Sequence, residues 1–160
     1  MADTRCQIEC EAWVRDVWLT HHLKQSFSER NIPLQSGGNF KFDAVSEDGT
    51  IVASISTSRA AMSGGKKGVG KLMKIRSDML FHLLALAPRH VMVFTESCMY
   101  ESVVAEKRRG RVPSQIELIR VELPPELSVR LAASRDRSSK EVQARVMETP
   151  EQAAGEPSRP

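Results

Sequence analysis

Two short segments joined by a tight turn constrain the fold of this chain more than any other feature of its sequence. Phe40 and Phe42 alternate with polar residues, and the turn sequence SEDGT leads into a second apolar segment from Ile51 to Thr57. An Asp-Gly turn between two such segments is typical of a β-hairpin, because glycine readily adopts the backbone conformation that tight turns require. The sequence therefore predicts two antiparallel strands in the first half of the chain.

Helices and further strands surround this hairpin. The expected elements are a long first helix over Cys6 to Arg30, the two hairpin strands, a helix over Lys71 to Ala87, a strand over His90 to Glu96, a short helix over Ser97 to Gly110, a strand within Gln115 to Pro124, and a helix that begins near Pro125. The unbroken apolar run Val91 to Phe94 is typical of a strand covered on both faces. This order predicts an α/β domain with a small mixed sheet of about four strands flanked by helices.

Length and composition fit one domain. The chain has 160 residues, of which 41% are apolar, and we expect a single domain over residues 1–132 and a polar, flexible tail over residues 133–160. No segment approaches the roughly 20 apolar residues needed to span a bilayer. The three cysteines form no dense disulfide framework. We therefore expect a soluble, cytoplasmic protein with no membrane partner.

A loop rich in glycine and lysine precedes the helix predicted from Lys71. The net charge of the chain is only +3, so the distribution of charge is more informative than its total. Glycines let the backbone approach a polyanion closely, and the start of a helix favours phosphate. The loop therefore predicts a contact with a nucleic-acid backbone, although a solvated loop would have a similar composition. The predicted contact residues are Arg59, Lys66, Lys67, Lys71, Lys74 and Arg76.

The same loop contains the sequence GKKGVGKL, which matches the G-x-x-x-x-G-K pattern of phosphate-binding loops between a strand and a helix. The next residue in that pattern is a serine or threonine whose hydroxyl binds magnesium, and Leu72 cannot do this. Nucleotide binding is therefore the weaker interpretation of this loop.

Acidic residues on the predicted first helix and the hairpin are placed in a way that resembles a known family. Asp43 ends the first hairpin strand in the sequence FDAVSEDGT, and Glu9 and Glu11 lie on the first helix. The segment from Ile8 to Phe94 resembles the PD-(D/E)XK family, the restriction-endonuclease-like nucleases. The resemblance implies a restriction-endonuclease-like fold, with Asp43 matching the metal-binding aspartate and Glu9 or Glu11 matching the acidic residue of the first helix. It also implies magnesium as the cofactor.

The chain departs from this family at the positions that matter most for cleavage. Ser54 and Ser56 stand where the family has an acidic residue and a lysine. A hydroxyl is a weaker ligand for magnesium than a carboxylate, and serine offers no charge to a phosphate. We therefore expect Asp43 to bind magnesium weakly.

Three interpretations of these serines remain open. The favoured one is a pseudo-nuclease that keeps the fold and binds nucleic acid without cutting it. In the second, catalytic groups have migrated, so that carboxylates come from Glu9, Glu11 or Glu96, and the cation comes from Lys66, Lys67 or Lys71. In the third, the resemblance concerns architecture alone and the chain is an unrelated small α/β domain.

The sequence thus predicts a nucleic-acid-binding protein with DNA as the expected partner and a degenerate metal site. The resemblance also implies a place in a larger assembly for restriction, repair or phage defence. An active magnesium-dependent nuclease and a protein-interaction module without nucleic acid are the alternatives. Sequence alone therefore does not decide whether the chain is an enzyme.

Overall fold

The computed structural model of the chain describes residues 4–60 and 68–147. Within this part, the strands form one five-stranded sheet in the order β1-β2-β3-β4-β5. Strands β1 to β3 pair in antiparallel fashion, whereas β4 and β5 continue the sheet in parallel with β3. The predicted mixed sheet is confirmed, with five strands rather than about four. The strands are β1 (Phe27–Pro33), β2 (Asn39–Ser46), β3 (Ile51–Ser56), β4 (Arg89–Phe94) and β5 (Ile116–Arg120).

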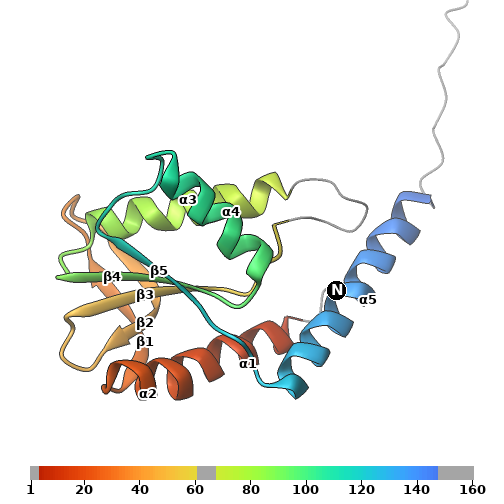
Figure 1. Cartoon of the computed structure of the whole chain (residues 1–160), viewed down its shortest axis with the longest axis horizontal. Coiled ribbons are helices and arrows are strands. Elements are labelled where there is room, and N and C mark those ends of the chain that lie inside the picture. Colours follow the sequence, from red (N-terminus) through yellow and green to blue (C-terminus); the bar gives the residue numbers. More distant parts are fainter. Residues whose placement is uncertain (1–3, 61–67, 148–160) are drawn as a thin grey trace, which may run out of the picture.

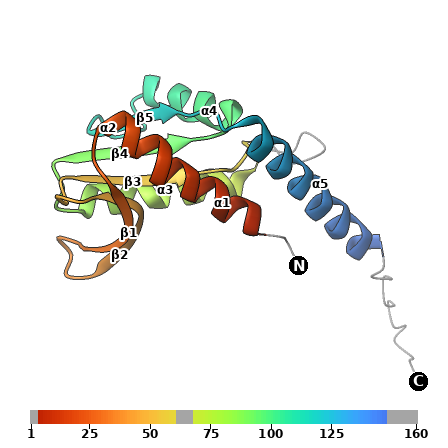
Figure 2. The ribbon, with the colours of Figure 1, turned by 90° about the horizontal axis from the view of Figure 1, so that it is seen from below.

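Helices cover both faces of this sheet (Figure 1). One face carries a nearly continuous helical stretch of three segments, and the opposite face carries α3 and α4. A last helix, α5, packs against α1 and extends away from the sheet (Figure 2). The helical segments are α1 (Arg5–Trp13), the π-helical η1 (Val14–Leu19), α2 (Thr20–Leu23), α3 (Val69–Leu84), α4 (Ser97–Arg108) and α5 (Pro125–Met147).

Strand β3 shows how the sequence divides its side chains between the two faces. Ile51, Ala53 and Ile55 belong to the core cluster that packs against η1. Val52, between them, packs in a different cluster with Phe81 and other residues near the end of α3. Successive side chains of a strand point to opposite faces, so a strand covered on both sides must be apolar throughout. Polar Ser54 in this strand is therefore an exception that requires a partner.

The predicted hairpin turn between β2 and β3 is confirmed. Gly49 has a φ of 72°, a left-handed conformation that glycine adopts without strain. The Asp48 carboxylate accepts hydrogen bonds from the Ser46 hydroxyl at 2.6 Å and from the Thr50 backbone N–H at 3.0 Å. Burial has little influence on Asp48, and these bonds lower its pKa to about 2. The turn is thus held by its own side chains.

The expected long first helix ends earlier than its apolar pattern predicts. Helix α2 stops at Leu23, and Lys24 takes a left-handed conformation with a φ of 57°. The next segment, predicted as helix up to Arg30, is strand β1, in which Phe27 pairs with Ser46 of β2. Leu23 and Phe27 lie four residues apart, a spacing typical of a helix, but pairing with β2 and burial of Phe27 outweigh this local preference.

The last helix begins at Pro125, as predicted, and continues past Ala133 to Met147. Its Leu131 is 1% exposed and packs against Cys6 and Cys10 of α1. Ser134 is also buried, so the packed part of the chain extends beyond residue 132. This contact with α1 stabilises a segment that its polar composition alone would not hold in a helix.

Candidate functional site

A cavity of about 300 Å³ lies where α1, the end of β3 and the first turns of α3 meet. It brings together an acidic residue of the first helix, the aspartate of the hairpin and lysines of α3. Hydroxyl-bearing residues that follow one another at the end of β3 complete its polar wall. The polar lining consists of Gln7, Glu11, Asp43, Ser56, Thr57, Ser58, Lys71 and Lys74. We refer to this site as the carboxylate–lysine pocket.

Asp43 is positioned by the way in which β2 and β3 separate. The two strands pair at Ala44 with Ala53 and at Val45 with Val52. Next to these pairs, the Ile55 N–H donates at 2.7 Å to the Asp43 carboxylate instead of to a strand carbonyl. Burial raises the pKa of Asp43, while this hydrogen bond and the charge of Lys74 act in the opposite direction. The Asp43 side chain therefore takes the place of a strand-to-strand hydrogen bond, and Asp43 lines the pocket.

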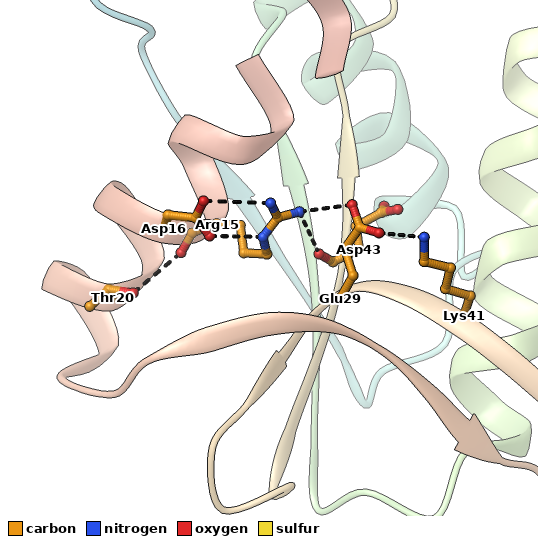
Figure 3. A network of polar contacts seen from close by, with 6 residues as sticks. All are labelled: Arg15, Asp16, Thr20, Glu29, Lys41 and Asp43. Atoms are coloured by element: carbon orange, nitrogen blue, oxygen red, sulfur yellow. Dashed lines mark hydrogen bonds and ion pairs between the residues drawn. The ribbon is translucent and has the colours of Figure 1, made fainter. Parts of the chain in front are cut away.

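The main chain at Asp43 is also tied to the first helical stretch (Figure 3). Arg15 of η1 donates to the Asp43 carbonyl oxygen at 3.4 Å and to the Glu29 carboxylate of β1 at 3.0 Å. Glu29 also forms an ion pair with Lys41 of β2. These contacts fix the distance between the helix and the strands on which the pocket acids lie.

Glu11 is the acidic residue of the first helix that reaches Asp43. Its pKa is raised to about 7, chiefly by burial and further by the negative charge of Asp43. A pKa displaced this far by burial and a specific neighbour is typical of functional sites, although structural networks can also produce it. Near neutral pH Glu11 is therefore partly protonated.

Glu9, the other candidate of the first helix, lies outside the pocket. Its carboxylate forms an ion pair with Arg130 of α5 at 2.6 Å. Residues two positions apart on a helix point in widely different directions. Of the alternatives that the sequence left open for this helix, the structure places Glu11 beside Asp43 and assigns Glu9 to the contact with α5.

Lys74 supplies a positive charge opposite these acids. Its ammonium group lies 2.8 Å from the carboxylate of Asp78, one turn further along α3. Burial opposes the charge of Lys74, but the hydrogen bond to Asp78 and the nearby acids outweigh this and raise its pKa. Lys71, one turn earlier, lines the same pocket. Both lysines were predicted as phosphate contacts, whereas Asp78 was not among the predicted site residues.

The two serines of β3, Ser54 and Ser56, have different environments. Ser54 is 4% exposed and its hydroxyl lies 3.0 Å from Nε2 of the buried His82 on α3. Burial and then the neighbouring His90 lower the pKa of His82 to about 3, so the imidazole is neutral. Ser56, in contrast, lines the carboxylate–lysine pocket. Ser54 thus satisfies a polar group of the core, and Ser56 is the serine that faces the site.

Among the described residues, two other predicted phosphate contacts, Arg59 and Arg76, do not line this pocket. Arg59 pairs with Glu96 at 3.1 Å, and Arg76 pairs with Glu106 of α4 at 3.3 Å. Lys66 and Lys67 lie outside the described residues, as does Gly65, the first residue of the segment matched to the nucleotide-binding pattern. Among the described residues, the positive charge available to a ligand in the pocket comes from Lys71 and Lys74.

The acids of the pocket are few for a metal ion. Within residues 4–60 and 68–147, no group of three or more His, Cys, Asp or Glu side chains is arranged to hold one. Glu11 and Asp43 are the residues that would bind magnesium, and Lys74 lies close enough to compete electrostatically for their charge. Magnesium usually requires carboxylates together with water or phosphate oxygens, so this pair fits a weak site better than a tight one.

Sequence signals could have identified part of this arrangement. Lys74 and Asp78 have the four-residue spacing at which helical side chains meet, and this spacing was visible in the sequence. The partnership of Ser54 with His82 depends on the packing of α3 on β3 and has no local signal.

In the described part of the chain, no helix is sufficiently long and apolar to cross a membrane.

Comparisons with protein-family models, curated proteins and solved structures gave no match.

Proposed function

We propose that this chain is a nucleic-acid-binding protein with a restriction-endonuclease-like fold, DNA as its partner and a degenerate metal site at Asp43. The observation that carries the proposal is the carboxylate–lysine pocket, in which Asp43 and Glu11 face Lys71 and Lys74. Lysines beside hydroxyl groups are suited to phosphate oxygens. The helix-and-hairpin placement of the two acids is the arrangement that the family resemblance implies.

The side chains of this pocket do not favour efficient cleavage of nucleic acid. Ser56 occupies the position of the family's lysine and carries no charge, while Ser54 points to His82 rather than to a ligand. Glu11, with a pKa of about 7, is partly protonated at neutral pH, which weakens it further as a magnesium ligand. The proposed activity is therefore binding, as part of a larger assembly in restriction, repair or phage defence.

Magnesium-dependent cleavage is the second candidate, and one specific observation favours it. Lys74 extends from α3 toward Asp43 and Glu11, so a lysine is available to the pocket although Ser56 has replaced the one expected on β3. This version of the migrated-residue hypothesis keeps Glu11 as the second carboxylate and takes Lys74 as the cation, which was not among the expected Lys66, Lys67 and Lys71. Under it, Asp43→Asn abolishes cleavage.

The binding proposal is tested with variants of the pocket lysines. We expect the double variant Lys71→Ala, Lys74→Ala to bind a labelled DNA duplex at least about tenfold more weakly, because phosphate contacts supply most of the affinity for a polyanion. The matched control is Arg89→Ala, which removes an exposed positive charge paired with Glu117 at the start of β4. Equal affinities of the double variant and the native chain in an anisotropy titration would refute the proposed contact.

A further inference from the structure

A second cavity, of about 340 Å³, is lined in part by Arg59, in the segment that follows β3. It lies outside the carboxyl ends of the parallel strands β3, β4 and β5, between the first turns of α4 and α5. Ligands of open α/β sheets bind preferentially outside the carboxyl ends of their strands. This cavity is distinct from the carboxylate–lysine pocket, because the described linings of the two share no residue.

Three arginines from three separate parts of the chain converge on this cavity. Arg59 follows β3, Arg120 ends β5, and Arg135 lies on α5. Two of them share one acid, since Glu96 pairs with Arg59 at 3.1 Å and with Arg135 at 2.9 Å. We call these residues the arginine cluster.

Arg120 is the member of the cluster with the weakest protein partner. Its guanidinium lies 3.1 Å from Glu122, whose side chain is 84% exposed. An ion pair between exposed side chains contributes little and is readily exchanged. Three arginines and two glutamates line the cavity, which leaves one positive charge uncompensated. The exposed ion pair of Arg120 with Glu122 can open when a ligand binds.

The donors around the cavity match a phosphate group. Guanidinium groups bind phosphate oxygens in pairs through parallel N–H groups, with defined geometry. Hydroxyl-bearing Thr95, Ser97 and Ser128 lie in the same wall and can donate to further oxygens. The volume exceeds that of a phosphate alone, so an attached sugar has room.

We propose that the arginine cluster is a binding site for a phosphomonoester, carried either on a mononucleotide or on the end of a nucleic-acid strand. Arg120 supplies the contact that the ligand gains, while Arg59 and Arg135 are held in place by Glu96. Arg135 also donates to the Thr57 carbonyl oxygen. Because Thr57 lines the carboxylate–lysine pocket, this hydrogen bond connects the arginine cluster with that pocket. The inference does not depend on the proposed DNA binding, because inorganic phosphate alone tests it.

The test compares thermal melting of the full chain with increasing inorganic phosphate and with chloride at equal ionic strength. A ligand that binds the folded state raises the melting temperature, and above its Kd the rise continues with the logarithm of the ligand concentration. We expect this rise with phosphate, beyond that with chloride, and its displacement to about tenfold higher phosphate in Arg120→Gln, which loses one charge-assisted contact. Arg89→Gln is the matched control, because it removes an arginine from another exposed ion pair at the opposite ends of β4 and β5.

Three results would overturn this proposal. They are a melting temperature that rises no more with phosphate than with chloride, equal weakening by Arg120→Gln and Arg89→Gln, and loss of the effect in the Lys71→Ala, Lys74→Ala variant with no loss in Arg120→Gln. Two further arms distinguish the ligand sources. A strand end is supported if a 5′-phosphorylated oligonucleotide binds more tightly than its 5′-hydroxyl counterpart and Arg120→Gln removes this difference. A mononucleotide is supported if adenosine monophosphate binds in an Arg120-dependent way while the two oligonucleotides bind equally.

Discussion

At the scale of single residues, the carboxylate–lysine pocket is distinguished by the shifted pKa values of its charged groups. Glu11 is held partly protonated at neutral pH, chiefly by burial. Lys74 is kept charged by the neighbouring acids. These residues could be found in the sequence as charged positions, but their distances and burial depend on three elements that meet only in the folded chain.

Glu11 should make the protein less stable as the pH rises. Its folded pKa, about 7, is above its ordinary value of 4.5, so the folded state favours the protonated form. Stability is therefore highest below about pH 4.5 for this group, and it falls until the pH passes about 7. We expect Glu11→Gln, which resembles the protonated form, to be about 2 kcal/mol more stable than the native chain at about pH 8.

Chemical denaturation at two pH values checks this expectation. The advantage of Glu11→Gln should disappear at about pH 4, where the native glutamate is itself protonated. Glu9→Gln serves as the comparison, because Glu9 pairs with Arg130 outside the pocket. An equal advantage at both pH values would contradict the assigned pKa of Glu11.

The same chemical change at two positions of β3 should have unequal effects. Ser54→Ala removes the hydroxyl partner of the buried His82, and an unsatisfied buried polar group costs about 1 to 3 kcal/mol of folding free energy. Ser56→Ala changes a residue of the open pocket and should cost less than about 0.5 kcal/mol. Urea denaturation of both variants measures the difference, and equal costs would show that the Ser54 contact contributes nothing.

At the scale of elements, local pattern predicted most of the fold and failed where pairing partners decide. The hairpin was predicted because its turn residues and alternation are local signals. Strand β1 was assigned to the first helix, since Leu23 and Phe27 have helical spacing, and its strand conformation depends on pairing with β2. The extension of α5 past Ala133 likewise depends on the contact of Leu131 with α1.

The anchoring of α5 should depend on its single buried leucine. Leu131 is 1% exposed, whereas Val129 of the same helix is 69% exposed. Leu131→Ala should lower the free energy of unfolding by about 2 to 4 kcal/mol, because it opens a space beside Cys6 and Cys10. Val129→Ala should change it by less than about 0.5 kcal/mol. Similar small effects of both variants would contradict the packing of α5 on α1.

At the scale of the whole molecule, charged side chains of the described residues line two separate cavities, the carboxylate–lysine pocket and the cavity of the arginine cluster. The net charge of +3 conceals this arrangement, and Arg59 and Arg76, predicted as part of one surface, are drawn to Glu96 and Glu106. The grouping of Glu11, Asp43, Lys71 and Lys74 in one pocket required the packing of α3 across the end of β3, which no local pattern encodes.

We propose that this molecule binds DNA at the carboxylate–lysine pocket without cutting it efficiently. The most direct measurement is an anisotropy titration of labelled duplex DNA in magnesium at two salt concentrations, with the same samples then run on a denaturing gel. We predict binding that weakens steeply with salt and DNA that stays intact. Absence of binding at both salt concentrations, or magnesium-dependent fragments that disappear with Asp43→Asn, would contradict the account.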